Sequence, residues 1–414
     1  MSEPAGDTPL PLDGLRILDL SRILAGPTCT QYLGDLGADV LKIERPGAGD
    51  DTRKWGPPYL KGPDGQDTQE SAYYLSSNRS KRSVAVNIAT EDGQALVKRL
   101  LRSCDVLVEN YKVGGLKKYG LAYEDLKAEF PGLVYCSITG FGQTGPYAKR
   151  AGYDFLAQGL GGIMSITGAP DGEPMKVGVG IADVMCGMYA ATAILAALRH
   201  RDRTGEGQHI DACLLDAQVA WLVNEGCNYL LSGAVPKRLG NEHPNIVPYK
   251  VFECADGHVI LAVGNDSQFQ KWCRFAGADD LAVDPRFATN SLRIANRAAL
   301  YEAMPPYMAR KTIDQWVDGL AEIGVPCSPV NTIDRVFEDP QVQARGMRLD
   351  LPHPEAGGDG TVPLIANPIK FSNSPIRYRH PPPTRGQHTA EVLEELLDLD
   401  TAELDRLRAA GAIE

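Results

Sequence analysis

One acidic residue before a long apolar stretch is the first candidate for chemistry in this sequence. Residues 177–198 read VGVGIADVMCGMYAATAILAAL, so a glycine-rich approach leads to Asp183 and an apolar helix follows. An acid in the first turn of a helix commonly caps unpaired backbone N–H groups. It can also present its carboxylate to an electrophilic carbonyl, with Gly178 and Gly180 letting the backbone approach a ligand and the helix N–H groups stabilising the oxyanion. The pattern predicts a cap or a nucleophile.

Basic residues gather near predicted loop ends. They are Lys42 and Arg45, then Arg79, Lys81 and Arg82, and then Lys117 and Lys118. Solvated surface charge accounts for such clusters, but Arg and Lys also neutralise phosphate groups. A protein that binds a phosphorylated small molecule would need such residues, and Arg45 is the first candidate.

Several common catalytic patterns are absent from the sequence. It contains no G-x-G-x-x-G, no P-loop and no G-x-S-x-G motif, which removes the main support for a nicotinamide dehydrogenase, a P-loop enzyme or a serine hydrolase. The nine Cys residues form no Cys-x-x-Cys pair and show no zinc-like spacing with the seven His residues, so no metal site is predicted. His243, in a polar loop, is either an ordinary loop residue or a substrate contact.

The elements that must position these residues alternate between strand and helix. Apolar runs predict strands at 15–20, 39–43, 83–88, 105–108 and 133–138, and the segments at 28–37, 90–102 and 123–130 predict helices. This alternation indicates an α/β fold with a parallel sheet covered on both faces. Ligands bind beyond the carboxyl ends of such strands, where the glycine-rich and charged loops of this chain fall.

The later part of the chain has a different texture. From about Pro248 to Ile323, short alternating runs precede helical stretches, which predicts a smaller α/β domain. Loops and hairpins follow Val325, and a helix is expected over 389–397. A chain of 414 residues is also longer than one core usually supports.

Composition narrows the class of partner and the compartment. The formal charge of −11 argues against a nucleic-acid partner. The first residues are polar and acidic, unlike a signal peptide, and the apolar stretch 188–198 is too short to span a bilayer. A cytoplasmic protein is therefore expected, with no membrane partner.

Ordered motifs along nearly the whole chain resemble the class III CoA-transferase family, whose members include formyl-CoA transferase, carnitine CoA-transferase and α-methylacyl-CoA racemase. The motifs are PLDGLRILDL at 11–20, LAGP at 24–27, GDLGADVLKIERP at 34–46, NRSKRS at 78–83, VENY at 108–111, SITGFG at 137–142, GYD at 152–154, AD at 182–183, TGEGQ at 204–208 and GQHT at 386–389.

The resemblance implies an architecture and a set of site residues. A Rossmann-like large domain over 1–220, completed by 330–414, is joined by a linker at 221–244 to a small domain over 245–328, and two subunits interlock as a homodimer. Asp183 matches the catalytic aspartate of the family. Residues that match CoA contacts are Arg45, Asn110, Tyr111, Lys118 and Tyr153, and Ile23, Leu24 and Ala25 match a backbone stretch near the thioester. Coenzyme A is a substrate, and no tightly bound cofactor is implied.

Two departures from the family pattern narrow the activity. Family racemases carry His where this chain has Tyr153, and a phenol is a poor base at neutral pH, so acyl transfer is favoured over racemisation. Formyl-transferring members carry Gln where Leu24 stands, so this departure argues against formate or oxalate chemistry. The fuller match, through GDDTRKWGPP at 49–58, resembles the branch containing succinyl-CoA:glutarate CoA-transferase. Arg53 or His243 would then hold the far carboxylate of a dicarboxylate.

The mechanism that the resemblance implies is covalent. Asp183 attacks the acyl-CoA to give a mixed anhydride and then carries coenzyme A as a thioester before passing it to the acceptor acid. The alternatives are an acyl-CoA racemase or epimerase with an unidentified second base, and a non-catalytic CoA-binding protein of the same fold.

Overall fold

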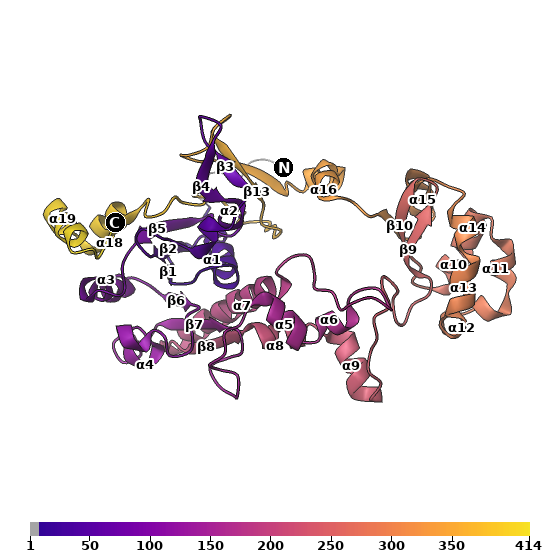
Figure 1. The fold of residues 1–414 in the computed structure, drawn as a ribbon, viewed down its shortest axis with the longest axis horizontal. Coiled ribbons are helices and arrows are strands. Elements are labelled where there is room, and N and C mark those ends of the chain that lie inside the picture. The colour runs from indigo at the N-terminus through magenta and orange to yellow at the C-terminus, as the bar shows by residue number, and fades with distance from the viewer. Residues whose placement is uncertain (1–7) are drawn as a thin grey trace. The chain divides into compact units, whose positions relative to one another are not determined.

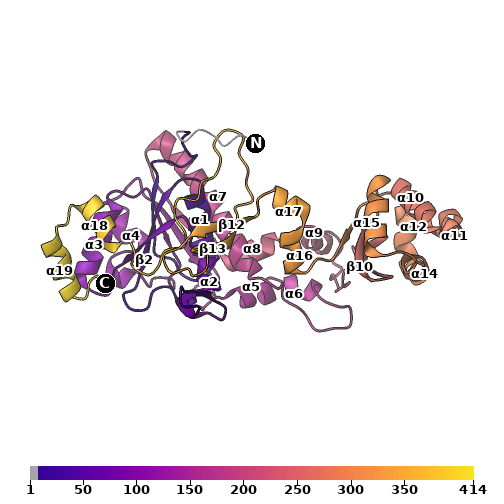
Figure 2. The same cartoon turned by 90° about the horizontal axis from the view of Figure 1, so that it is seen from above.

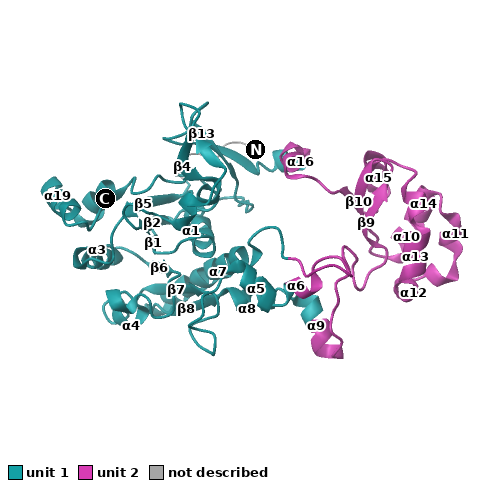
Figure 3. Cartoon of the chain, viewed as in Figure 1, with its two compact units in different colours: residues 1–163, 176–226, 341–414 teal, residues 164–175, 227–340 magenta. Residues whose placement is uncertain are grey.

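A computed structural model describes residues 8–414, which form two compact units (Figure 3). Unit 1 consists of the chain up to Ile163, Lys176–Gly226 and Gln341–Glu414, and unit 2 of Met164–Met175 and Cys227–Pro340. Unit 2 is thus longer than the small domain expected over 245–328. Its first piece joins the rest because the Arg238 side chain donates hydrogen bonds to two backbone oxygens within 164–175.

Unit 1 is built on a six-stranded parallel sheet with the order β5-β2-β1-β6-β7-β8 (Figure 1). The strands are β1 Arg16–Asp19, β2 Asp39–Glu44, β5 Lys81–Ala85, β6 Val106–Glu109, β7 Val134–Thr139 and β8 His209–Cys213. All neighbouring strands pair in parallel, so the predicted α/β fold with a parallel sheet is confirmed. The sequence prediction lacks β8, because it relied on apolar runs and HIDAC at 209–213 is not one.

Side chains that alternate along each strand supply a core on each face of the sheet. On β1, for example, Ile17 joins one core and Leu18 joins the other. The first core is covered by α1 Ala25–Asp35, α5 Asp154–Leu160, α7 Ile181–Thr204 and α8 Leu214–Ala220. The second is covered by α3 Glu91–Leu101, α4 Tyr123–Leu126, α18 Thr389–Leu397 and α19 Thr401–Ala409. Figure 2 shows α18 beside α3 at one end of the unit.

Helix α7 extends well beyond the apolar stretch recognised in the sequence. By length and composition alone it is able to cross a membrane. Within unit 1, however, it packs against α1, β7 and α8. The contact with α1 is close, since a Cβ at Gly187 would lie 2.5 Å from the Ala25 carbonyl oxygen. Helix α7 is therefore a core helix of unit 1.

The C-terminal part of the chain covers the outer edge of the sheet at β5. The N–H of His388 donates to the Ser83 carbonyl oxygen at 2.9 Å, and the N–H of Ala85 donates to the Thr389 hydroxyl oxygen at 2.9 Å. The GQHT motif at 386–389 thus binds the edge strand β5 through these hydrogen bonds. Two antiparallel hairpins complete the unit, β3 Tyr59–Lys61 with β4 Asp67–Ser71 and β12 Arg348–Pro352 with β13 Thr361–Ile365.

Unit 2 combines a small antiparallel sheet with short helices. Its strands, in the order β11-β10-β9, are β9 Tyr249–Cys254, β10 Gly257–Ala262 and β11 Cys327–Pro329. Its helices include α10 Asp266–Ala276, α11 Asp279–Val283, α12 Asn290–Ala295, α13 Arg297–Ala303, α14 Pro305–Met308, α15 Ile313–Glu322 and α16 Ile333–Glu338. Trp272 and Trp316 are fully buried in its core. The helices of the chain not yet named, in either unit, are α2 Ala72–Leu75, α6 Ile163–Ile166, α9 Val223–Ser232 and α17 Pro340–Ala344. Short 3-10 turns lie at Asp51–Lys54, Lys117–Tyr119 and Pro285–Phe287.

Candidate active site

Asp183 does not cap its own helix. Helix α7 begins after Gly180, and the carboxylate of Asp154, at the start of α5, accepts hydrogen bonds from the N–H groups of Ala182 at 2.8 Å and Asp183 at 3.3 Å. Within residues 8–414, no hydrogen bond reaches the Asp183 carboxylate. Another aspartate therefore does the capping, and the Asp183 side chain is free for chemistry.

The first N–H groups of α7 are all occupied. Ile181 donates to the Val179 carbonyl oxygen at 2.8 Å, and the next two residues donate to Asp154. The expectation that this helix start stabilises an oxyanion does not hold. Helix α1 instead begins at Ala25 without a side-chain cap and faces the same cavity as Asp183, so its first N–H groups are the available donors.

A buried glutamine fixes the aspartate that caps α7. The Gln158 amide donates to Asp154 at 2.7 Å, and its oxygen accepts from the Val177 N–H at 2.9 Å. These bonds tie α5 to the glycine-rich approach to α7. A Cβ on Gly180 would lie 3.1 Å from the Leu24 side chain, so the loop after β1 also packs closely against this helix start.

The environment of Asp183 makes its carboxyl unusually basic. Burial and then the negative charge of Asp154 raise the pKa of Asp183 from its usual 3.8 to about 7. A carboxylate with a higher pKa is a better nucleophile once ionised, and near pH 7 about half of the population carries the charge. The site therefore suits covalent catalysis near neutral pH.

Asp183 lines a cavity of 440 Å³ in unit 1. The cavity lies at the carboxyl ends of β1, β6 and β7, where the strand order reverses direction and where open parallel sheets bind ligands. Its lining also includes Ile23, Leu24, Ala25, Asn110, Tyr111, Lys118 and Tyr153. The structure thus brings all these residues together around the carboxylate.

Arg45 lines an adjoining cavity of 390 Å³ at the ends of β2 and β1. The two cavities share Arg22, Tyr111 and Tyr119 as a common wall. The Arg45 side chain is exposed, directly after β2. A long ligand can therefore extend from Arg45 past this wall to Asp183.

The loop after β1 is held in a strained conformation. Ile23 has a φ of 75°, which is rare for a β-branched residue. Its N–H donates to the buried Asp50 carboxylate at 3.2 Å, and Asp50 pairs with the buried Lys42 at 2.9 Å. The Asn110 amide makes two hydrogen bonds, of 3.0 and 2.7 Å, with the backbone of Arg22. Both polar atoms of the Asn110 amide therefore hold the loop after β1 in place.

Comparison with known proteins decides the family. The family model described as "CoA-transferase family III" matches residues 12–389. The chain belongs to this family. It is 51% identical over 386 residues to the succinate–glutarate CoA-transferase of Agrobacterium fabrum, covering 93% of this chain and 96% of that protein. It is 43% identical over 408 residues to the succinyl-CoA:glutarate CoA-transferase of Mus musculus, covering 99% and 91%.

A solved structure supports the same assignment. The crystal structure of a CaiB/BaiF family protein from Brucella suis is 51% identical to this chain, with a TM-score of 0.83 over 94% of this chain and 99% of that one. The predicted family, fold class and enzyme class are confirmed for this family III CoA-transferase, as is the resemblance to the succinyl-CoA:glutarate branch.

Sequence reasoning missed three residues of this family III site, namely Asp154, Gln158 and Tyr73. Burial and then the charges of Asp183, Asp154 and Asp50 raise the pKa of Tyr73, so its hydroxyl stays protonated beside the carboxylates. The ring of Tyr73 packs edge-on against Trp55 at 5.0 Å. Only Asp154 left a signal in the sequence, as the last residue of the GYD motif.

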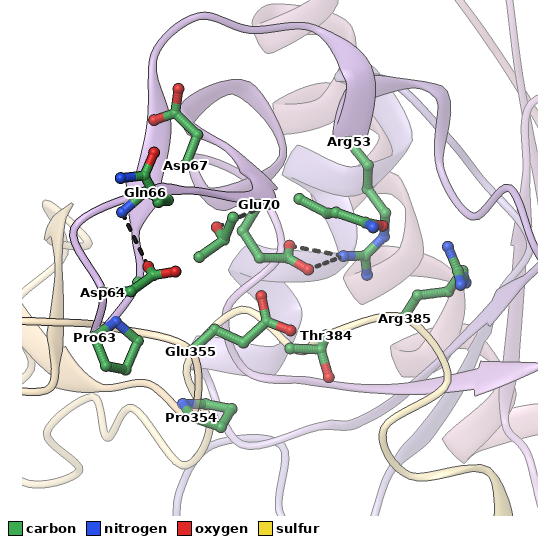
Figure 4. Close-up of a pocket in the computed structure, with 13 residues that line it drawn as sticks. Arg53, Pro63, Asp64, Gln66, Asp67, Glu70, Pro354, Glu355, Thr384 and Arg385 are labelled. Carbon is green, nitrogen blue, oxygen red and sulfur yellow. Dashed lines mark hydrogen bonds and ion pairs between the residues drawn. The ribbon is translucent and has the colours of Figure 1, made fainter.

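Arg53, expected to hold a substrate carboxylate, lies elsewhere and is fully engaged. It lines a separate cavity of 680 Å³, shown in Figure 4. The buried guanidinium donates to both oxygens of Glu70 at 2.8 and 2.7 Å and to both oxygens of Glu44 at 2.9 and 2.7 Å, and it stacks on Tyr74 at 3.7 Å. The structure does not bring Arg53 to Asp183.

His243 belongs to unit 2. Its ring nitrogen Nδ1 accepts a hydrogen bond from the Asn245 N–H at 3.0 Å, and the ring lies 5.2 Å from that of Tyr249. These are the local contacts of a loop histidine. They leave a contact of His243 with substrate as a prediction.

Asp154→Asn is expected to shift the pH dependence of the reaction. Asparagine keeps an oxygen for the start of α7 but removes the charge that helps to raise the pKa of Asp183. That pKa should fall, more carboxylate is then ionised below pH 7, and the acid limb of kcat/KM moves to lower pH. Rates measured from about pH 5 to 9 check this. Exposed Glu124→Gln is the control, and an acid limb that stays in place in Asp154→Asn would contradict the assignment.

Proposed function

We propose that this chain transfers coenzyme A from succinyl-CoA to a dicarboxylate such as glutarate, with Asp183 as the covalent nucleophile. The supporting observation is a carboxyl of raised pKa, free of capping bonds, in a cavity at the reversal point of the sheet. The proteins that are 51% and 43% identical to this chain are named for that reaction.

In the first half-reaction, the Asp183 carboxylate attacks the thioester carbonyl of succinyl-CoA. The C–S bond breaks, which gives a succinyl–aspartyl anhydride and CoA thiolate. The thiolate then attacks the aspartyl carbonyl of the anhydride, and succinate leaves. Asp183 now carries coenzyme A as a thioester.

The second half-reaction runs the same steps in reverse order with the acceptor. The glutarate carboxylate attacks the aspartyl thioester, thiolate leaves, and a glutaryl–aspartyl anhydride forms. Thiolate attacks the glutaryl carbonyl and frees the Asp183 carboxylate. Each attack places negative charge on a carbonyl oxygen, and the open start of α1 at Leu24 and Ala25 supplies the N–H groups for it.

Coenzyme A would lie across the two adjoining cavities. Arg45 would face its phosphates in one cavity, with Lys118 beside the shared wall. The pantetheine arm would pass Tyr111 and Tyr153 toward the carboxylate. Asn110 and Ile23 would act through the shape of the loop after β1, since the Asn110 amide holds that loop.

The interlocked homodimer remains part of the proposal. Phe155, Leu156 and Leu160 on α5 are 56%, 51% and 53% exposed, next to the site, and an apolar patch of this kind suits a second copy of the chain. The packing of α7 inside unit 1 is consistent with the proposed cytoplasmic location.

A trapping experiment tests the covalent step. The enzyme is incubated with succinyl-CoA, without acceptor, and treated with hydroxylamine or borohydride before peptide mass mapping. We expect modification at Asp183 alone, and none in an Asp183→Asn control. Deuterium wash-in at Cα of the acyl group, which a racemase would cause, is not expected. Exchange between acyl-CoA and acids without any trapped residue would contradict the proposal.

A further inference from the structure

With Arg53 committed to two glutamates, another cation must recognise the far end of a dicarboxylate. We propose that Arg150 binds the carboxylate remote from the thioester and thereby selects dicarboxylates over monocarboxylates. This inference rests on the proposed function, because it assigns the substrate specificity of the same site.

Arg150 is an exposed residue that lines the Asp183 cavity. Its guanidinium lies over the Tyr147 ring at 3.7 Å from the ring centre. No carboxylate of the described residues pairs with it. Stacking on a ring leaves the N–H edge of a guanidinium open, and that edge matches both oxygens of a carboxylate. The Arg150 guanidinium is therefore positioned to bind an anion that enters the cavity.

The other arginine of this cavity is less suitable. Arg22 pairs with Asp51 at 2.6 Å, so its charge is already matched. Arg150 is therefore the guanidinium of this cavity that a substrate carboxylate can claim without breaking an ion pair.

Position along the sheet separates Arg150 from the residues suited to the nucleotide. Lys118 stands next to Tyr119, in the wall shared with the Arg45 cavity at β2 and β1. Arg150 belongs to the segment that follows β7, and β6 separates β7 from β1 in the sheet. A coenzyme with its phosphates near Arg45 and Lys118 would thus reach Asp183 with the acyl group directed toward the Arg150 side.

The loop that carries Arg150 is anchored at its base. Gly140 and Gly152 pack backbone against backbone, since a Cβ on Gly140 would lie 2.4 Å from the Gly152 Cα. This contact holds the two ends of the segment 140–152 together. It therefore restricts the positions of Arg150 and Tyr153, which lie at the end of that segment. A defined position is what a specificity group needs.

The test compares two acceptors that differ only at the far end, glutarate and its monomethyl ester, with succinyl-CoA as donor. The variants are Arg150→Met and the control Lys149→Met, whose exposed side chain is adjacent in sequence but does not line the cavity. The ratio of kcat/KM for glutarate to that for the ester should fall by roughly tenfold or more in Arg150→Met, because a charge-assisted hydrogen bond is lost. Lys149→Met should keep the wild-type ratio.

Binding of free coenzyme A, measured by titration calorimetry, separates the two anions that Arg150 could hold. We expect the Kd for coenzyme A to change by less than about twofold in Arg150→Met, since the phosphates lie elsewhere. A Kd that rises as much as the KM for glutarate would assign Arg150 to phosphate and overturn the proposal, as would an unchanged acceptor ratio. A wild-type enzyme that transfers to neither acceptor would refute the proposed function, and this inference with it.

Discussion

Asp183→Asn is expected to lower the rate of CoA transfer by roughly 10⁴-fold or more, because an amide cannot form the anhydride or the thioester. The folded structure should survive, since Asp154 supplies the cap of α7. The rate of succinyl-CoA consumption in the presence of glutarate measures the effect, and titration with free coenzyme A should show that binding persists.

The stability of this variant provides an internal control with a definite sign. A folded-state pKa of about 7 for Asp183, against 3.8 as the usual value, means that the folded protein resists ionisation of this group. Its contribution to stability is therefore fully present below the unfolded pKa and is lost as the pH rises through 7. Asp183→Asn removes this loss, so its Tm at pH 8 should equal or exceed that of the wild type. A variant that unfolds, or that keeps more than about a tenth of the activity, would contradict the assigned role.

The frame of the fold was accessible from sequence because local signals agreed with the tertiary structure. Thr90, the first residue of the predicted helix 90–102, caps α3 with its hydroxyl accepting from the Gly93 N–H, and α18 spans the predicted residues 389–397. Strand β5 departs from its predicted bounds. It begins at Lys81 instead of residue 83, because charged side chains that suggest a surface are buried there.

Buried ion pairs also changed the interpretation of the basic clusters. Arg79 bonds to both oxygens of Asp35, and Lys81 lies 3.3 Å from Asp19. Arg45, by contrast, is exposed at a cavity. Sequence gives the same letters for structural and ligand-binding cations, and only the partners, which lie tens of residues away, distinguish them.

The sequence could not show that Asp183 makes no capping bonds, because the residue that caps its helix also lies far away in the sequence. Its cap comes from Asp154, 29 residues earlier, through contacts between α5 and α7. The assignment of Arg53 as a substrate clamp relied on residue type and loop position, which do not reveal that Glu44 and Glu70 already bind it. The resemblance to a family supplied the positions of the site, and the structure supplied the state of each group.

Lys42→Met is expected to be the most destabilising change near the site. Lys42 and Asp50 are both fully buried and 2.9 Å apart, and removing one partner of such a pair costs about 3–5 kcal/mol because the other charge is left without compensation. Lys42 also donates to the Ser21 carbonyl oxygen at 3.0 Å, and Asp50 holds the N–H of Ile23. The loop that forms one wall of the cavity should therefore relax, and the Kd for coenzyme A should rise. Denaturant unfolding and calorimetric titration measure the two effects.

The double variant Lys42→Met with Asp50→Asn separates charge burial from loop positioning. It leaves no unpaired buried charge, so much of the stability lost in Lys42→Met should return. The bond from Lys42 to Ser21 stays absent, however, and a neutral amide at position 50 holds the strained Ile23 less firmly than a carboxylate does. Coenzyme A binding should thus stay weak while the fold recovers. Recovery of both together would mean that the ion pair contributes stability alone, and that the conformation of the loop after β1 does not depend on it.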